Sequence, residues 1–204
     1  MLSEGDGNQL ENFISINIDR LGFDDQYKLL SGIIIPRPIA FVSTLNSDGS
    51  ATAAPFSSFM IASVEAGLLA FSVGPSENPK RTLQNIRSNG EFVINMVHEQ
   101  LATQVQICGQ ESPESVAKLQ IAGLALLDST LIRTPRIRES KIHFECKLHS
   151  ITQFGQSNMI VGHAELMHVE RNLLANGRIE PLEYAPLGRI AGRKYCLVRE
   201  IISV

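Results

Sequence analysis

The clearest chemical pattern in the sequence is a pair of bases at the expected start of a helix. Lys80 and Arg81 precede the hydroxyl of Thr82, and Asn78-Pro79 before them is typical of a helix N-terminus. Helix N-termini carry unpaired N–H groups and partial positive charge, so bases are unfavourable there unless an anion binds. With an anion present, the amides, both cations and the hydroxyl would form a phosphate site. A pair of solvated surface bases is the alternative, and this motif alone does not exclude it.

A second candidate is the stretch 53–59, which reads AAPFSSF. Pro55 and the small residues around it interrupt the ladder of a strand and leave backbone N–H and C=O groups available. Such groups can read the edge of a flat heterocycle by hydrogen bonds, and Phe56 and Phe59 offer aromatic contact. An edge strand with a bulge explains the same residues without any ligand, and this alternative stays open.

The other polar residues form no pattern that is typical of a catalytic or metal centre. His163 lies in an apolar run, where a hydrogen-bonded core histidine is commoner than a catalytic one. The sequence has no nucleotide-binding glycine motif, no nucleophile elbow and no metal-ligand spacing of histidines or cysteines, so no metal is expected. Apolar neighbours indicate free buried thiols in a reducing compartment for all three cysteines, Cys108, Cys146 and Cys196.

The composition is that of a single globular domain. The chain has 204 residues, of which 44% are hydrophobic, and 18 bases against 21 acids give a net charge of −3. These values exclude a disordered chain and a disulfide scaffold, and they lack the basic excess of nucleic-acid-binding domains. The N-terminus lacks a signal-peptide pattern and no apolar run approaches the roughly 20 residues of a membrane span, so we expect a cytoplasmic protein without a membrane partner. Residues 1–28 hold six acids and two bases, which predicts a solvated acidic arm.

Strands dominate the expected secondary structure, and most follow one another directly. Asp48-Gly49 predicts a hairpin turn, and Gly90 predicts the left-handed end of the helix that begins near Asn78. Residues 142–148 alternate strictly between an apolar side and a polar side that is expected to face solvent. Strands are expected over 39–45, 51–61, 67–73, 91–97, 142–148, 157–171 and 195–202, and helices over 79–89, 99–108 and 113–119. The predicted class is a mainly antiparallel sheet or barrel with a few helices.

These segments, taken in order, resemble the flavin reductase-like, FMN-binding split-barrel family, and within it the flavoredoxin-type branch. Each motif alone is weak, whereas six motifs in the family's order are specific. The resemblance covers roughly residues 28–200. It rests on 36–44 (PRPIAFVST) with Asp48-Gly49, 54–59 (APFSSF), 80–86 (KRTLQNI), 91–95 (EFVIN), 161–164 (VGHA) and 186–189 (PLGR) with Tyr195.

The resemblance implies an α+β, mainly β architecture: a homodimeric split antiparallel β-barrel that holds FMN in a groove near the subunit interface. The barrel domain would span 28–204, after an acidic N-terminal arm over 1–27. Two departures from the family pattern are visible. Arg81 stands where an acid is frequent, and Ala191-Gly192 replaces a pair of glycines beside Arg189.

The resemblance also implies a set of cofactor-binding residues. Lys80 and Thr82 would bind the phosphate, with Ser43 and Thr44 beside them. The ribityl chain and the isoalloxazine ring would meet Ala54, Pro55, Phe56, Ser57 and Phe59, with assistance from Ser72.

The function that the resemblance implies is an NAD(P)H-dependent flavin reductase that passes electrons to an acceptor the sequence does not identify. Free flavin, ferric iron, a partner oxygenase and an organic substrate are all alternatives. Hydride transfer to flavin needs no general acid or base, so the candidate catalytic residues are those expected on the open flavin face, Arg37, His163 and Arg189. An FMN carrier or storage protein without significant turnover is the alternative function, and a partner-binding barrel with a decayed flavin site is a third.

Overall fold

A computed structural model of the chain describes residues 12–75, 80–110 and 118–204. The chain falls into two compact units, of which the second runs from Ile35 to Val204. The first unit contains a short 3-10 helix, η1 (Ile18–Arg20), and the helix α1 (Phe23–Ile33). The domain boundary expected between residues 27 and 28 falls within α1, whereas the boundary between the two units follows Ile34.

The second unit confirms the predicted class, since it is mainly β with a few short helices. Its strands are β1 (Ala40–Leu45), β2 (Ala51–Phe56), β3 (Phe59–Ser63), β4 (Leu68–Val73), β5 (Glu91–Met96), β6 (Leu126–Leu127), β7 (Arg136–Ile137), β8 (Ile142–Phe154), β9 (Ser157–Val169), β10 (Leu174–Ala175), β11 (Arg178–Ile179), β12 (Leu187–Arg189) and β13 (Tyr195–Leu197). Its helices are α2 (Arg81–Asn89), α3 (Ala102–Cys108), α4 (Lys118–Ile121) and α5 (Pro181–Tyr184), with the 3-10 helices η2 (Glu99–Leu101) and η3 (Arg171–Leu173).

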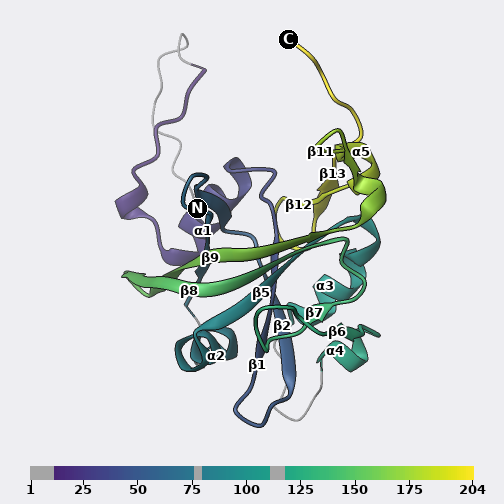
Figure 1. Cartoon of the computed structure of the whole chain (residues 1–204). Coiled ribbons are helices and arrows are strands. Elements are labelled where there is room, and N and C mark those ends of the chain that lie inside the picture. Colours follow the sequence, from purple (N-terminus) through teal and green to yellow (C-terminus); the bar gives the residue numbers. More distant parts are fainter. Residues whose placement is uncertain (1–11, 76–79, 111–117) are drawn as a thin grey trace. The chain divides into compact units, whose positions relative to one another are not determined.

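Seven strands form one antiparallel sheet in the order β2-β1-β5-β8-β9-β4-β3. The sheet curls into a half-barrel with the long β8–β9 hairpin at its centre (Figure 1). The edge strands β2 and β3 are consecutive in the chain and are separated only by Ser57 and Ser58. Because this connection is only two residues long, the curl brings the two edges of the sheet together at this turn, and the Ser72 N–H extends the β3–β4 pairing to the Ser58 carbonyl at 2.9 Å.

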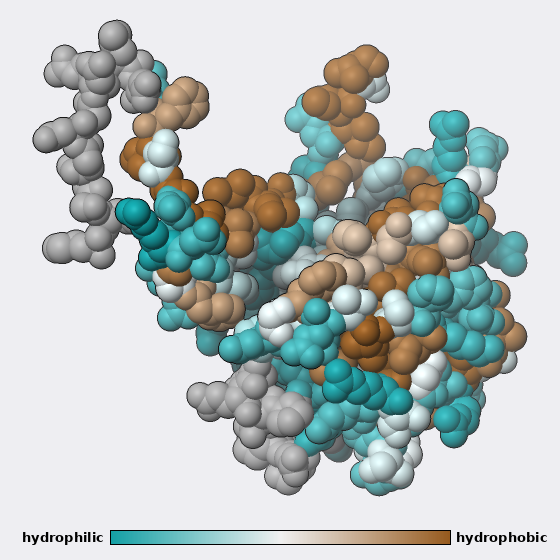
Figure 2. Space-filling view, turned by 90° about the vertical axis from the view of Figure 1, so that its left-hand side faces the viewer, coloured by the Kyte–Doolittle hydropathy of each residue, from teal (hydrophilic) through white to brown (hydrophobic). Residues whose placement is uncertain are grey.

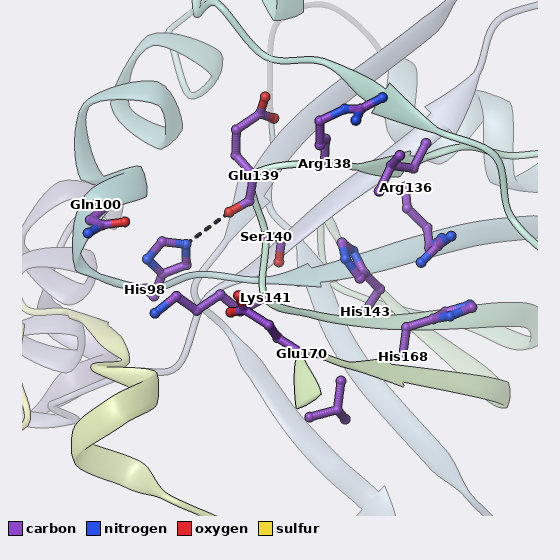
Figure 3. A pocket seen from close by; sticks show the side chains of 12 residues that line it. His98, Gln100, Arg136, Arg138, Glu139, Ser140, Lys141, His143, His168 and Glu170 are labelled. Atoms are coloured by element: carbon purple, nitrogen blue, oxygen red, sulfur yellow. Dashed lines mark hydrogen bonds between the residues drawn. The ribbon is translucent and has the colours of Figure 1, made fainter. Parts of the chain in front are cut away.

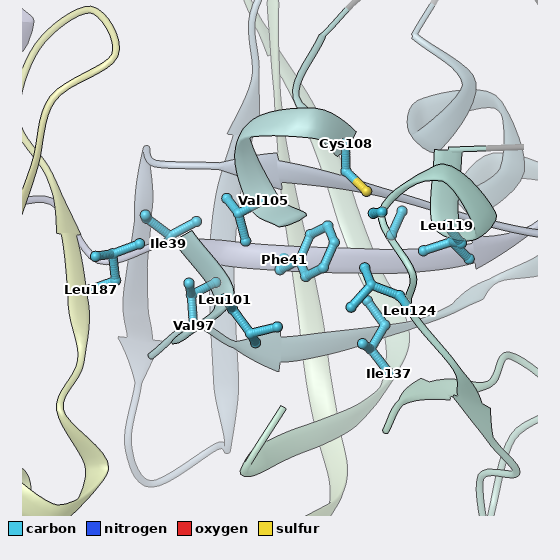
Figure 4. Packing of buried hydrophobic residues seen from close by; sticks show 12 residues of the cluster. Ile39, Phe41, Val97, Leu101, Val105, Cys108, Leu119, Leu124, Ile137 and Leu187 are labelled. Carbon is cyan, nitrogen blue, oxygen red and sulfur yellow. The ribbon is translucent and has the colours of Figure 1, made fainter. Parts of the chain in front are cut away.

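Each face of the half-barrel carries its own hydrophobic cluster, because side chains alternate between the two faces of a strand. On the inner face, Val42 and residues from β4, β5, β8 and β9 pack around Ile86 of α2. On the outer face, Phe41 packs against Val105 of α3 and Leu119 of α4 (Figure 4). The sheet therefore separates α2 from α3 and α4.

The single strand predicted over 51–61 is wrong, since the chain forms two strands there. Residues 51–56 pair with β1 at one edge of the sheet, and residues 59–63 pair with β4 at the other. The continuous β propensity of the sequence does not reveal this division. It arises because the chain leaves one edge strand of the curled sheet, β2, and enters the other edge strand, β3, at Ser57-Ser58.

The hairpin turn at Asp48-Gly49 and the helical region over 99–108 are confirmed. Gly90 ends α2 with φ 69°, a left-handed conformation that glycine adopts without steric cost, as predicted. The last strand is shorter than predicted, because it ends at Leu197 and the chain beyond it is not in a strand. The expected helix start at Asn78-Pro79 and most of the helix expected over 113–119 lie outside the described residues.

The polar side of 142–148 was expected to face solvent, and this is wrong for its first half. His143 is 5% exposed and Glu145 is fully buried. Both Glu145 oxygens accept hydrogen bonds at 2.7 Å, one from the Thr130 N–H and the other from the Leu131 N–H. The loop that contains Thr130 and Leu131 therefore covers this strand and provides the hydrogen bonds of its buried carboxylate.

The first unit presents apolar side chains on its surface. Phe23, Tyr27 and Ile33 of α1 are all more than half exposed, and apolar residues of this unit are brown in Figure 2. The Phe23 and Tyr27 rings are stacked, with centroids 6.3 Å apart. None of the described helices has the length and apolar character that a membrane span needs.

Candidate functional site

The beginning of α2 has the composition that favours an anion. Lys80 is the N-cap residue, and within the described chain its side chain makes no capping hydrogen bond. The first turn carries Arg81 and no acid, and Thr82 is buried directly behind it. Because the positive end of the helix dipole points at this turn, the added cations favour a bound anion.

Asn85 fixes α2 against the end of β1. Its Nδ2 donates to Thr44 Oγ1 and to Asn46 Oδ1, each at 2.9 Å, and the side chain is 8% exposed. The helix start is thus held at a defined distance from the β1–β2 turn. Asn85 is not among the predicted site residues, because one amide within a helical pattern has no distinctive spacing.

Three of the predicted cofactor-binding residues share the inner face with α2. Thr44 contacts Asn85, while Ala54 lies opposite Val42 and Phe56 lies opposite Ala40 in the β1–β2 register. Cross-strand partners point to the same face, so these side chains line the strands that α2 covers. The structure therefore places Lys80, Thr82, Thr44, Ala54 and Phe56 on one side of the sheet.

Ser43 and Pro55 point to the opposite face, because each is adjacent in its strand to a residue of the inner face. Ser43 is fully buried, with its hydroxyl donating to the Pro135 carbonyl at 2.7 Å. It also accepts a hydrogen bond from Asn95 Nδ2 at 3.1 Å. The structure thus does not bring the Ser43 side chain to the start of α2.

Ser57, Phe59 and Ser72 meet where the two edges of the half-barrel join. All three are partly buried, and the Ser72 N–H donates to the carbonyl of Ser58 between the other two. The Phe56 ring packs on Phe71 with centroids 5.0 Å apart, which closes the inner face at the same point.

Arg37 and Arg189, two of the three candidates for the open flavin face, lie together beside Ser57. Their backbones exchange hydrogen bonds of 3.0 and 2.8 Å, and Arg37 Nε donates to Ser57 Oγ at 3.4 Å. The Arg189 guanidinium lies 4.7 Å from the centroid of the Tyr195 ring. The Tyr195 hydroxyl donates to Gln106 Oε1 at 3.0 Å and accepts from the Arg189 guanidinium, so a hydrogen-bonded tyrosine fixes this arginine.

His163, the third candidate, was considered as a partly buried core histidine, and its side chain is in fact 48% exposed. Its Nδ1 lies 3.0 Å from Glu165 Oε1 on β9, and Lys147 Nζ lies 3.5 Å from the other carboxylate oxygen. Hydrogen bonding by His163 lowers the pKa of Glu165. His163 therefore belongs to an exposed charged group on β8 and β9, separate from the Arg37–Arg189 pair.

A row of paired residues crosses the outer face from β1 to β9. Phe41 lies opposite Asn95, Asn95 opposite His143, and His143 opposite His168. Asn95 Oδ1 accepts the Ile137 N–H at 2.8 Å and lies 3.0 Å from His143 Nδ1, so this ring nitrogen is the donor. Burial, with the nearby charges of Arg136 and His168, lowers the pKa of His143 to about 4.

The buried His143 predicts a loss of stability in weak acid. The unfolded chain binds a proton at this ring near pH 6.5 and the folded chain only near pH 4, so the free energy of unfolding falls as pH drops through this window. We expect a loss of about 3 kcal/mol from this residue, since each pKa unit corresponds to about 1.4 kcal/mol. Urea unfolding between pH 7.5 and 4.5 measures it. His143→Gln, which keeps an amide donor near Asn95, should flatten the profile, and an unchanged slope in that variant would contradict the assignment.

The cysteines are free, as predicted, but Cys196 is only partly buried, so its predicted burial is wrong. Cys108 and Cys146 are buried, and burial raises the pKa of the Cys108 thiol to about 11 and that of Cys146 further still. Neither is therefore a nucleophile at neutral pH. In the parts of the chain that the structure describes, no group of three or more histidines, cysteines or acids is placed to hold a metal ion.

Comparison with known proteins identifies the type of domain. The family described as "Flavin reductase like domain" matches residues 31–190. An uncharacterized protein of Aquifex aeolicus is 38% identical over 175 residues, which cover 84% of this chain and 89% of that protein.

Two solved structures are similar over nearly their whole length. Nitrilotriacetate monooxygenase component B from Bacillus cereus superposes with a TM-score of 0.89 at 29% identity, covering 95% of this chain and 100% of that one. Pseudomonas fluorescens 2-nitrobenzoate 2-nitroreductase superposes with a TM-score of 0.86 at 32% identity, covering 94% and 95% of the two chains.

Proposed function

Because this chain belongs to the flavin reductase-like domain family, we propose that it is an FMN-dependent oxidoreductase that takes electrons from NADH or NADPH. Members of this family bind FMN. The observation that carries the proposal is the start of α2, where Lys80, Arg81 and buried Thr82 lie on the same side of the sheet as Ala54 and Phe56.

The residues fit the two chemically different halves of FMN. The dianionic phosphate suits a helix N-terminus that bears two cations and no acid in its first turn. The flat ring suits the partly buried Phe56 and Phe59, with backbone groups of 54–57 at the sheet edge to bond its polar rim. Asn85 would keep these two halves of the site at a fixed separation, because it ties α2 to β1.

FMN, when bound, supplies the hydride-accepting chemistry, and the protein binds and orients it. Arg37 and Arg189 would receive the phosphates of the nicotinamide nucleotide, since they form a pair of cations beside Ser57. Tyr195 holds Arg189 in place before any ligand arrives, which reduces the entropy lost on binding. His163 would act on the acceptor side, from its exposed position on β9.

The two similar structures suggest different electron acceptors. Component B of a monooxygenase favours a partner oxygenase, whereas a nitroreductase favours a small organic substrate.

The family resemblance adds a homodimer with the flavin near the interface. Light scattering at working concentration tests this: twice the 22.4 kDa chain mass is expected, and a monomer would contradict it.

The decisive experiment is an anaerobic absorption spectrum of the protein with FMN before and after NADH or NADPH. Bleaching of a bound-flavin spectrum by either nucleotide is expected for a reductase. A flavin spectrum that stays oxidised with both would favour the alternative, an FMN carrier or storage protein. Absence of bound flavin would contradict both functions.

Replacing Lys80 by alanine is expected to weaken FMN binding about 10- to 100-fold, because a hydrogen bond to a charged group contributes about 1.5–3 kcal/mol. Quenching of FMN fluorescence measures the dissociation constant. Arg87→Ala is the matched control, since it removes the same charge from the last turn of α2, where Arg87 donates to Asn158 Oδ1 at 3.1 Å. Equal weakening by both variants would show that the effect comes from net charge alone and would contradict a contact between Lys80 and FMN.

A further inference from the structure

A cavity of about 510 Å³ opens on the outer face of the half-barrel. It lies among the ends of β5, β8 and β9 and the segment that precedes β8, and its lining shares no residue with the predicted flavin site. His143 and His168 belong to the row that includes Phe41, on the face opposite to α2. The sheet therefore separates this cavity from the start of α2.

Three histidines and three cations line the cavity. His98 lies on one side, His143 and His168 lie on the other, and Lys141 lies between them (Figure 3). Arg136 and Arg138 complete the set of bases. The chain as a whole carries a net charge of −3, so this concentration of bases is local.

The hydrogen bonds of these bases do not neutralise them. Arg136 donates from Nη2 to the Asp128 carbonyl at 2.8 Å, and Lys141 donates from Nζ to the Glu183 carbonyl at 3.3 Å. Both acceptors are uncharged. The guanidinium of Arg136, whose Nε also donates to the Asp128 carbonyl at 3.2 Å, and the ammonium of Lys141 thus keep their charge for a ligand.

Among the described residues, two acids also line the cavity, Glu139 and Glu170, so the three lining cations outnumber the lining acids by one. The Glu139 carboxylate is already engaged, since the Ala125 N–H donates to its two oxygens at 3.1 and 3.2 Å. Buried Glu145 lies behind His168 and accepts from its Nε2 at 2.7 Å. That contact fixes the orientation of the imidazole, and it leaves Nδ1 as the second polar atom of the ring.

The histidines add acceptors to this set of donors. His98 Nε2 donates to the Glu139 carbonyl at 2.9 Å, so its Nδ1 is an acceptor when the ring is neutral. Burial lowers the pKa of both His98 and His143, which keeps the two rings uncharged at neutral pH. A ligand here therefore meets fixed cations together with neutral imidazoles.

We propose that this cavity binds a small organic anion, one that carries a carboxylate or phosphate group together with hydroxyl or amide donors. The cations suit the anionic group, and the imidazole nitrogens suit the donors. The volume lies within the range of about 300–1,000 Å³ that small-molecule sites occupy, and it is larger than an inorganic ion needs. This site is independent of the proposed flavin chemistry.

Histidine ring resonances provide a test with an internal control. The chain has five histidines, of which three line the cavity, whereas His149 and His163 lie outside it. The full chain, with FMN in excess so that the predicted flavin site is occupied, is titrated with citrate, glycerol 3-phosphate or inorganic phosphate. Shifts at His98, His143 and His168 are expected with one or both organic probes, at lower concentration than with phosphate. No shifts, or equal shifts at His149 and His163, would overturn the proposal.

A matched pair of variants then separates a local contact from general charge. Arg138→Ala removes a lining cation, and we expect it to raise the citrate or glycerol 3-phosphate dissociation constant about tenfold. Arg133→Ala removes the same charge from the same segment outside the lining, and should change the constant less than twofold. Equal effects of the two variants, or binding of inorganic phosphate as tight as that of both organic probes, would contradict an organic-anion site.

Discussion

Replacing Glu145 by alanine is expected to lower the free energy of unfolding by about 3–5 kcal/mol, because it leaves buried hydrogen-bond donors without an acceptor. This carboxylate is fully buried and accepts from the N–H groups of Thr130 and Leu131 and from His168 Nε2, each at 2.7 Å. Burial opposes its ionisation, yet these three hydrogen bonds hold its pKa below the usual value. Equilibrium unfolding in urea measures the loss.

The chain offers a matched control for this variant. Glu165 on the neighbouring strand also pairs with a histidine, with His163 Nδ1 at 3.0 Å, but at an exposed position. Glu165→Ala should therefore change stability by less than about 1 kcal/mol. If Glu145→Ala does not fold, Glu145→Gln keeps one carbonyl acceptor and should give a smaller but measurable loss. Equal effects of the Glu145 and Glu165 variants would show that the buried carboxylate does not hold the covering loop.

The predictions from sequence succeeded where neighbouring residues decide the structure. Gly90 ends α2 because glycine adopts the left-handed conformation there, and Asp48-Gly49 makes the β1–β2 turn. The predictions failed where segments far apart in the sequence decide the structure. The division of 51–61 into two strands depends on the curl of the whole sheet, and the burial of Glu145 depends on a loop that the alternation of β8 does not reveal.

The same distinction applies to the candidate site. Strand alternation places Ser43 and Thr44 on opposite faces, so one of them was bound to point away from α2. Once β1 is assigned as a strand, the sequence alone therefore predicts that only one of these two side chains can face α2. The row from Phe41 to His168, in contrast, needs the register of four strands, β1, β5, β8 and β9. No spacing in one sequence gives that register, so the cavity beside the row was not predicted.

Replacing Gly162 by alanine is expected to destabilise the half-barrel by about 2–4 kcal/mol, because the added methyl group overlaps the core beneath α2. A Cβ at this position would lie 2.3 Å from Phe92 Cζ and 3.3 Å from Cys146 Cβ. Phe92 is fully buried and meets Phe71 edge-on, with ring centroids 5.6 Å apart, so the ring has little room to move. Thermal or urea unfolding measures the loss.

A second substitution shows whether the clash with Phe92 causes that loss. Phe92→Leu alone should destabilise the protein by creating a cavity, yet combined with Gly162→Ala it should cost less than the sum of the two, with a coupling of about 1–2 kcal/mol. Gly74→Ala is the control, since a Cβ there meets no atom of the described residues within 4 Å and should leave stability nearly unchanged. Strict additivity of the Gly162 and Phe92 substitutions would contradict the clash. The result also bears on function, because the same cluster contains Leu83 and Ile86, through which α2 and its proposed phosphate-binding turn are held to the sheet.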